Sequence, residues 1–298
     1  MKILLLGKNG QVGWELQRSL APLGELIALN SSSKKLCGDL TNLSGIQTTV
    51  RKIAPDIIVN AAAYTAVDKA ESESELAHII NAEAPGMLAQ EAKQLKAWLI
   101  HYSTDYVFDG KGNQPYLETD IPNPSNIYGK SKLTGENNIV AAGCSHLIFR
   151  TSWVYGAHGN NFMKTILRLA QQRDQLNVVN DQIGSPTGAE LVADITAYVL
   201  RTLKYQSDVS GIYHLVAKGE TSWFEFAKFI LQQAYNANFS LKVQANALSP
   251  IPSSAFPLPA KRPLNSRLNT SRLEETFGLN LPEWEISASR TLAEILNK

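Results

Sequence analysis

Short apolar runs alternate with helical patterns through the first half of the chain, and this alternation constrains the fold more than any other feature. The runs are apolar on both faces, which is typical of strands that are covered on each side. Repeated strand-then-helix units predict a parallel, doubly wound α/β sheet (Rossmann-like), whose ligands bind beyond the carboxyl ends of the strands. The predicted strands lie in "KILLLG", "ELIALN", "PDIIVNAAA", "AWLIHYSTDYVF" and "SHLIFRTSWVYG", and a long helix is predicted over 74–97.

The turn after the first predicted strand is rich in glycine. In "GKNGQVG", Gly7, Gly10 and Gly13 follow the strand and open a helix. Glycines here permit a tight turn and a close approach of backbone to ligand, and the helix N-terminus offers N–H groups to a pyrophosphate. A plain strand–turn–helix connection is the alternative. At the first βα turn of an alternating chain, the spacing favours dinucleotide binding.

The end of the second predicted strand bears on the choice of cofactor. An acidic residue there suits a ribose 2′-hydroxyl, whereas neutral or basic surroundings tolerate a 2′-phosphate. Asn30 stands at this position and is followed by three serines, Lys34 and Lys35. We therefore predict that NADPH is favoured and that NADH is also accepted. A polar surface loop would have the same composition.

The pentapeptide "YGKSK" places Tyr128 and Lys132 four residues apart where a helix is predicted to begin, with Ser125 or Asn126 as its cap. This spacing puts both side chains on one helix face. An ammonium group beside a phenol lowers the phenol's pKa, so the tyrosine could exchange a proton near neutral pH. The alternative is a packed tyrosine and an ordinary pair between Lys132 and Glu136.

The second half of the chain mixes predicted helices, one strand and a proline-rich stretch over 248–269. We predict a dinucleotide-binding domain over 1–152, to which about 178–210 returns, and a smaller mixed α/β substrate domain over about 153–177 and 211–298.

Composition excludes several function classes. Charged residues make up 18% of the chain and the net charge is +1 without a long basic run, so a nucleic-acid partner is not expected. The four consecutive apolar residues near the start are too few for a signal peptide or a membrane span. Cys37 and Cys144 are isolated, as expected for reduced thiols in a cytoplasmic protein.

The motifs, taken in order, resemble the extended short-chain dehydrogenase/reductases, and in detail the dTDP-4-dehydrorhamnose reductase family. The resemblance rests on "GQVGWELQ", "CGDL", "NAAAYTAVDKAE", "HYSTDYVF", "YGKSKLTGE", "FRTSWVYG", "NDQIGSPTGAELVAD" and "RPLNSRL". It spans essentially the whole chain. It implies reduction of dTDP-4-dehydro-L-rhamnose (dTDP-6-deoxy-L-lyxo-4-hexulose) to dTDP-L-rhamnose by hydride transfer from NAD(P)H, a step in making bacterial surface polysaccharide such as lipopolysaccharide.

The resemblance also implies residue roles. Tyr128 would donate the proton, Lys132 would lower the pKa of Tyr128 and hold the nicotinamide ribose, and Thr104 would hydrogen-bond the carbonyl oxygen. Asp105, Trp153, Arg262 and Arg267 would contact the substrate, the two arginines through its phosphates. The implied cofactor-binding residues are Gly7, Gly10, Gln11, Val12, Gly13, Asn30, Asp39, Leu40, Ala61, Ala62, Ala63, Thr65, Tyr128 and Lys132. Core packing is the alternative for Trp153 and the apolar members, and a solvated loop for the arginines.

Some members of the family bind magnesium between subunits, and the matching residues are Glu15, Glu190 and Glu294. Carboxylates from helices of two chains can bind a hard cation, so the resemblance implies Mg²⁺ and a homodimer. Each of these glutamates alone is most simply a solvated helix residue.

Three other functions share this fold. Dehydratases of the family place an Asp-Glu pair after the threonine, whereas here Asp105 is followed by Tyr106. Epimerases retain their cofactor through the cycle, which the sequence does not reveal. A non-catalytic regulatory subunit that binds NADP is the third, and the intact Thr104, Tyr128 and Lys132 argue against it.

Overall fold

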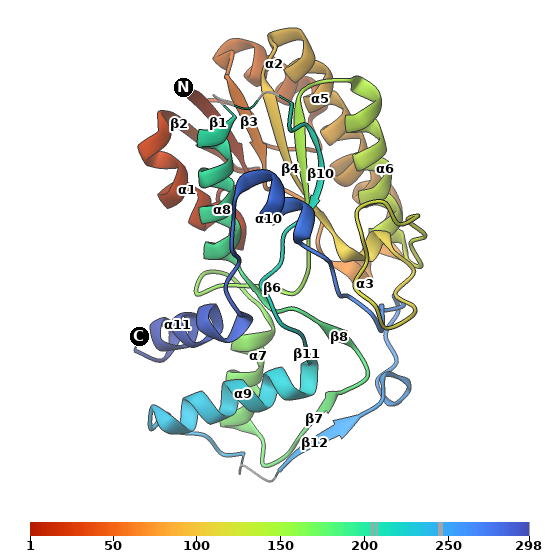
Figure 1. Ribbon diagram of the computed structural model, residues 1–298, viewed down its shortest axis with the longest axis vertical. Coiled ribbons are helices and arrows are strands. Elements are labelled where there is room, and N and C mark those ends of the chain that lie inside the picture. The colour runs from red at the N-terminus through yellow and green to blue at the C-terminus, as the bar shows by residue number, and fades with distance from the viewer. Residues whose placement is uncertain (204–205, 207, 244–246, 298) are drawn as a thin grey trace.

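The computed structural model describes residues 1–203, 206, 208–243 and 247–297. A six-stranded sheet forms its centre, built from β1 (Lys2–Leu6), β2 (Glu25–Leu29), β3 (Ile57–Asn60), β4 (Trp98–Thr104), β5 (His146–Thr151) and β10 (Gly211–His214). The strand order is β10-β5-β4-β3-β1-β2, and every neighbouring pair is parallel (Figure 1). The predicted doubly wound α/β fold is confirmed.

Alternate residues of each strand enter different cores, as the period of a strand requires. Ile3 and Leu5 pack with α1 (Gln11–Leu20) and α8 (Ala189–Thr202) on one face. Leu4 and Leu6 belong to the core on the other face. That second face is covered by α2 (Leu43–Ile53), α5 (Ala84–Leu95) and α6 (Ile127–Ala142). Helices therefore bury both faces of the sheet, which explains why its strands are apolar throughout.

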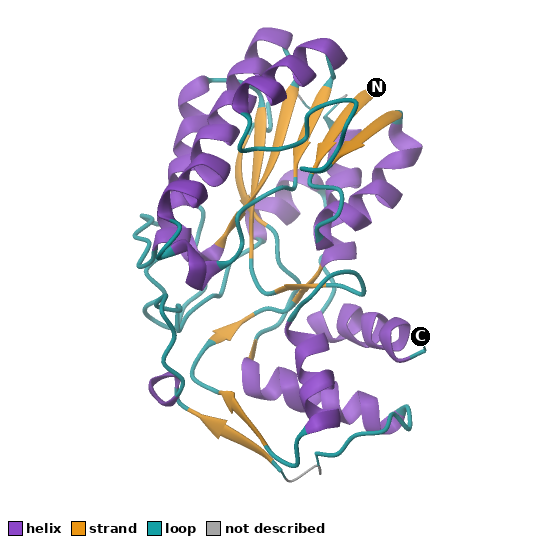
Figure 2. Cartoon of the chain, turned by 180° about the vertical axis from the view of Figure 1, so that it is seen from behind, coloured by secondary structure: helices purple, strands orange, loops and turns teal. Residues whose placement is uncertain are grey.

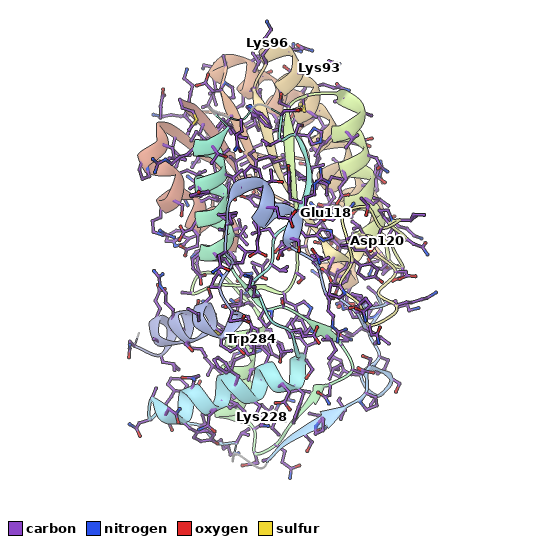
Figure 3. The ribbon with its side chains drawn as sticks, in the orientation of Figure 1. Lys93, Lys96, Glu118, Asp120, Lys228 and Trp284 are labelled. Carbon is purple, nitrogen blue, oxygen red and sulfur yellow. The ribbon has the colours of Figure 1, made fainter. Side chains whose placement is uncertain are left out.

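A smaller part with its own core lies beyond the carboxyl ends of the sheet strands (Figure 2). Its helices are α7 (Phe162–Gln172), α9 (Trp223–Asn236) and α11 (Trp284–Leu296). Three two-stranded pairs accompany them: β6 (Val154–Tyr155) with β9 (Thr187–Gly188), β7 (Leu176–Val179) with β12 (Leu248–Ile251), and β8 (Ile183–Gly184) with β11 (Thr221–Ser222). Trp284 packs edge-on against Phe226 and Phe229, between α11 and α9 (Figure 3).

Short elements complete the chain: η1 (Ala21–Leu23), α3 (Val67–Ala70), α4 (Ser74–His78), η2 (Ile79–Glu83), η3 (Asp105–Val107), η4 (Ser253–Ala255) and α10 (Ser271–Phe277). The predicted helix over 74–97 is thus α4, a π-helical turn (η2) and α5 in sequence. The predicted strand around 145–156 is interrupted between β5 and β6 at Trp153, whose φ is +49°. The segment "AELVADITAYVLRTLK" predicts a helix over 189–204, and the last residue of this range lies outside the described residues.

The structure differs from the predicted domain division in two places. β10 was expected in the substrate domain, but it pairs with β5 and extends the central sheet. Strands β8 and β9 and the end of β7, expected to return to the larger domain, instead pair with β11, β6 and β12 of the smaller part. We propose a two-domain division in which β10 belongs to the larger domain. Among the described residues, no helix combines the length and apolar character needed to cross a membrane.

Candidate active site

A cleft of about 840 Å³ lies where the carboxyl ends of the sheet strands face the smaller part. Its walls come from the turn after β1, the segments after β2 and β3, the ends of β4 and β5, and α6. Most of the predicted site residues line it: Gly7, Gly10, Gln11, Val12, Asn30, Asp39, Leu40, Ala61, Ala62, Ala63, Thr65, Thr104, Asp105, Tyr128, Lys132 and Trp153. Residues from distant parts of the sequence therefore meet at the edge predicted for a ligand.

The glycine turn allows the backbone to line this cleft closely. Gly7 has φ +87°, a conformation that side chains rarely adopt. Gly13 does not line the cleft, because it packs under the turn, where a Cβ atom would overlap the Gly7 carbonyl oxygen. Helix α1 begins at Gln11 with Gly10 as a cap that offers no side chain. The first N–H groups of α1 are thus free of a side-chain cap, as a pyrophosphate site requires.

The segment after β2 lines the cleft beside the glycine turn, since the Gly7 N–H donates to the Leu29 carbonyl oxygen at 2.9 Å. Asn30 Oδ1 accepts hydrogen bonds from Ser33 Oγ at 2.9 Å and from Ser32 Oγ at 3.3 Å. Asp39 Oδ1 accepts from the backbone N–H of Thr41 at 3.0 Å, and Leu40 is buried beside it. The loop that follows Asn30 is therefore tied to its side chain.

Tyr128 and Thr104 meet at the centre of the cleft. Thr104 ends β4, and Tyr128 lies in the first turn of α6, which Asn126 caps by accepting from the Gly129 N–H at 2.7 Å. Burial raises the pKa of Tyr128 to about 12, and its hydrogen bond with Thr104 opposes that rise. We predicted that Lys132 lowers this pKa, but Lys132 Nζ has other partners and the effect of burial on Tyr128 dominates.

Lys132 is buried and its Nζ points toward β4. It donates to the Tyr102 carbonyl oxygen at 2.6 Å and lies 3.1 Å from His101 Nε2. Burial lowers the pKa of Lys132 to about 8, and the charge of Glu136 opposes this. The alternative pairing of Lys132 with Glu136 does not form, because Glu136 takes Arg150 as its partner at 2.7 Å.

Asp105 follows Thr104 and is 3% exposed. Thr104 Oγ1 donates to Asp105 Oδ1 at 3.0 Å, and burial raises the pKa of Asp105 to about 6 against the hydrogen bonds from Ser266 and Thr104. Asp105 therefore places an acidic side chain in the cleft beside Thr104.

Trp153 forms the wall contributed by the smaller part. Its ring stacks on Trp223 with centroids 3.5 Å apart and planes at 11°. Trp223 also lines the cleft, and its Nε1 donates to Gln182 Oε1 at 3.1 Å. Two stacked indoles thus present a flat apolar surface to the site.

Neither predicted phosphate-binding arginine lines the cleft. Arg262 donates to Asp68 Oδ2 at 2.6 Å and lies over the Tyr106 ring, while Arg267 donates to Glu220 Oε2 at 2.5 Å. Contact of either guanidinium with a substrate phosphate stays a prediction, and it would have to compete with these carboxylates.

The predicted metal ligands lie on three helices: Glu15 on α1, Glu190 on α8 and Glu294 on α11. Burial raises the pKa of Glu190, and the nearby charge of Glu15 adds to this. Helices α1 and α8 thus bring two of the carboxylates close together. Within the described part of the chain, no group of three or more His, Cys, Asp or Glu side chains is placed to hold a metal ion.

Sequence reasoning missed several lining residues. Trp223 and Tyr106 are aromatic residues whose place in the cleft no local motif revealed. His101 does not line the cleft but lies directly before the lining segment Tyr102–Thr104, and in "AWLIHYSTDYVF" it was predicted only as part of a strand. A polar residue inside an otherwise apolar buried strand was the signal that could have identified His101.

Comparison with known proteins gives a consistent result. The model of the family described as "RmlD substrate binding domain" matches residues 1–297. The chain is 54% identical over 295 residues to dTDP-4-dehydrorhamnose reductase of Escherichia coli strain K12, with 99% of this chain and 98% of the relative covered. It is similar to the solved dTDP-4-dehydrorhamnose reductase of Clostridium acetobutylicum, with a TM-score of 0.89, 38% identity and 99% of each chain covered. It is also similar to that of Bacillus anthracis in complex with NADP, with a TM-score of 0.86, 39% identity, and 99% of this chain and 100% of that chain covered.

Proposed function

The chain belongs to the dTDP-4-dehydrorhamnose reductase family, and from that premise we propose that it reduces C4 of dTDP-4-dehydro-L-rhamnose to give dTDP-L-rhamnose. The observation that carries the proposal is the meeting of Thr104 and Tyr128 in the cleft. Reduction of a ketone needs a proton for the developing alkoxide and a hydrogen bond to the carbonyl oxygen. Tyr128 supplies the first and Thr104 the second.

NADPH supplies the hydride in this proposal. A Bacillus anthracis relative was solved in complex with NADP, and the cleft of this chain has the glycine turn and the uncapped helix start that suit a pyrophosphate. Gln11 and Val12 would meet the pyrophosphate through backbone N–H groups, and Ala61–Thr65 would line the middle of the cofactor. Asn30 carries no charge that would exclude a 2′-phosphate, so NADPH is favoured and NADH is accepted.

The substrate end of the cleft is assigned to Asp105, Trp153 and, through the phosphates, Arg262 and Arg267. Trp153 on Trp223 offers a face against which a deoxysugar can pack. Once Lys132 Nζ leaves its partners on β4, Lys132 holds the nicotinamide ribose and stabilises the Tyr128 phenolate. The product would enter bacterial surface polysaccharide, and the protein would act in the cytoplasm, where Cys37 and Cys144, which form no disulfide, stay reduced.

The test is consumption of NADPH when the keto-sugar nucleotide is added to purified protein. A reductase consumes one NADPH for each product molecule and releases the oxidised cofactor. No net consumption, with an isomerised or dehydrated sugar, would favour an epimerase or a dehydratase. No conversion of the sugar at all would favour a regulatory subunit.

We also propose a homodimer that uses Mg²⁺. Glu15 and Glu190 supply two adjacent carboxylates from one chain, and Glu294 with a second copy would complete an oxygen site of the kind that Mg²⁺ prefers. Trp14 on α1, Tyr198 on α8 and Ile286 on α11 are large and half-exposed or more, as expected for helices that pack on another chain. Sedimentation should show a dimer that a chelator and Glu294→Gln both shift toward monomer. The same assembly with and without chelator would contradict this part of the proposal.

A further inference from the structure

A chain of buried polar groups runs from the backbone after β3 to Lys132. Asn60 ends β3 and pairs in register with His101 on β4. Lys132 reaches this pair from α6, and all three side chains are 1% exposed. The polar atoms of these side chains have hydrogen-bond partners in one another and in the neighbouring backbone.

The backbone fixes the direction of the first hydrogen bond. The Ala62 N–H lies 3.2 Å from Asn60 Oδ1. An N–H can only donate, so the Asn60 atom that faces it must be the amide oxygen. The amide NH₂ of Asn60 is then the group that faces His101, with Nδ2 3.2 Å from Nδ1. The orientation of this amide is therefore set by chemistry and not by an arbitrary choice between oxygen and nitrogen.

The amide in turn fixes the tautomer of His101. Because Asn60 presents a donor, Nδ1 must be the acceptor, and a neutral imidazole then carries its proton on Nε2. That Nε2–H lies 3.1 Å from Lys132 Nζ. An ammonium group has only donors and cannot accept this N–H, whereas a neutral amine has a lone pair for it. One of the two amine hydrogens is donated to the Tyr102 carbonyl oxygen at 2.6 Å.

We propose that Asn60 and His101 are positioning residues that hold Lys132 as a neutral amine in the ligand-free chain, with His101 fixed as the Nε2–H tautomer. In this state each of the four hydrogen bonds, from the Ala62 N–H to the Tyr102 carbonyl oxygen, joins a donor to an acceptor. The reverse state, with an ammonium at Lys132, would set the amide NH₂ of Asn60 against the Nδ1–H of His101.

The charges around Lys132 agree with this state. Burial holds the pKa of His101 well below its usual value, so the imidazole is neutral, and burial also lowers the pKa of Lys132 to about 8, which favours the amine. Glu136 on the same helix would favour the ammonium, but Arg150 of β5 engages it with hydrogen bonds of 2.7 and 3.0 Å. From η2, the Asn81 amide donates to Ser131 of α6 and the Ala82 carbonyl oxygen accepts from Asn138.

Two titratable groups at the mouth of the cleft complete these surroundings. Tyr128, one turn before Lys132, keeps its proton because burial raises its pKa to about 12. Asp105 of η3 hydrogen-bonds Thr104 at 3.0 Å. Neither has a hydrogen bond to Lys132 Nζ among the described contacts, so neither offsets the effect of His101.

The consequence for catalysis rests on the proposed function. A neutral Lys132 held on β4 does not stabilise a Tyr128 phenolate, so the ligand-free site has an unreactive tyrosine. Lys132 can take up a proton once its Nζ leaves His101 for another acceptor in the cleft. Asn60 and His101 thereby keep the proton donor inactive until the cleft is filled.

The test is the tautomer of His101 in the ligand-free protein, read from ¹⁵N NMR of the imidazole at about pH 9, where a free histidine is neutral and which lies above the pKa of about 8 of Lys132. The chain has five histidines, so loss of one signal in His101→Gln assigns the resonance. We expect the Nε2–H form in the wild type. A wild-type Nδ1–H form, or an imidazolium, would overturn the proposal.

A variant that reverses the direction of these hydrogen bonds makes the test more specific. Asn60→Asp can only accept, so it should draw the proton to Nδ1 and switch His101 to the Nδ1–H tautomer. Asn138→Asp is the matched control, because Asn138 lies near the end of α6 and donates to the Ala82 carbonyl oxygen instead; it should keep the Nε2–H form. An unchanged tautomer in folded Asn60→Asp would overturn the role of Asn60. The wild-type spectrum decides the central point even where the variant does not fold. The tautomer measurement uses neither cofactor nor substrate. An unexpected tautomer therefore does not contradict the proposed reductase activity, and a wild type that consumes no NADPH does not contradict the tautomer assignment.

Discussion

Replacing Glu136 by glutamine would leave a guanidinium buried without its counter-charge. Arg150 and Glu136 are 2% and 1% exposed, and three hydrogen bonds of 2.7 to 3.2 Å join them. The guanidinium also lies 5.0 Å from the centroid of the Phe108 ring, and its Nη1 has no hydrogen-bond partner among the described residues. Removal of one partner of such a pair costs about 3–5 kcal/mol, because the remaining charge stays desolvated.

We therefore expect Glu136→Gln to lower the free energy of unfolding by about 3–5 kcal/mol, measured by urea denaturation followed by circular dichroism. The matched control is Glu225→Gln. Glu225 pairs with Lys228 on the surface of α9 at 3.4 Å, with side chains 51% and 64% exposed (Figure 3). Such a pair contributes less than about 1 kcal/mol, so the control should stay near the wild type.

A second substitution separates charge from shape. In Glu136→Leu with Arg150→Met both charges are gone, and most of the stability should return, since apolar replacement of a buried pair is often neutral or stabilising. A loss below about 0.5 kcal/mol in Glu136→Gln would refute the reasoning, because it would mean that Arg150 reaches solvent. A double variant as unstable as the single one would show that packing, and not the charge, carries the effect.

Three further predictions concern the cleft. Tyr128→Phe should leave cofactor binding nearly intact and lower turnover by roughly 10²-fold or more, whereas Lys132→Met should weaken both; near-normal turnover in Tyr128→Phe would remove the tyrosine from the mechanism. Asn30→Asp should shift the ratio of kcat/KM for NADPH over NADH toward NADH by about tenfold or more, and an unchanged ratio in this variant would place Asn30 away from the ribose. Added salt should narrow the wild-type preference for NADPH if Lys34 and Lys35 contribute to it. The fold favours protonated Asp105, whose pKa is raised to about 6, so its contribution to stability is fully present below about pH 3.8 and is lost as the pH rises through about 6. Asp105→Asn should therefore gain up to about 3 kcal/mol relative to the wild type between pH 4 and pH 7 in urea denaturation, and an equal difference at both pH values would contradict this.

The sequence predicted the larger domain well because its signals are local. Strands apolar on both faces predicted helices on both faces of the sheet, and the structure has them. Gly7 adopts the positive φ that a tight turn needs, and Asn126 caps α6 as one of the two residues proposed for that position. Each of these features depends on residues within a few positions of one another.

Features that depend on distant residues could not be predicted. The segment "GIYHLVA" has the same apolar pattern as any other strand, and only its pairing with β5 places it in the central sheet. Lys132 and Glu136 of α6 have the helical spacing of a pair, but each has a partner on a strand instead. Lys132 lies against His101 of β4, and Glu136 pairs with Arg150 of β5. Tertiary contacts thus overrode a local expectation in the middle of the site.

The smaller part was harder for a related reason. Its two-stranded pairs join segments far apart in the sequence, such as β7 with β12, and each strand is too short for a clear pattern. Trp223 lines the cleft because α9 begins beside Trp153, a neighbourhood that no spacing in the sequence encodes.

Transfer of deuterium tests the central claim most directly. The protein would be incubated with the keto-sugar nucleotide and with NADPH that carries deuterium as the transferable hydrogen on C4 of the nicotinamide ring. The product would be analysed by NMR and mass spectrometry. The account predicts dTDP-L-rhamnose with deuterium on C4 of the sugar, and product formation slower by roughly 10²-fold or more in Tyr128→Phe. A sugar product without deuterium at C4, or unchanged keto-sugar beside intact cofactor, would contradict it.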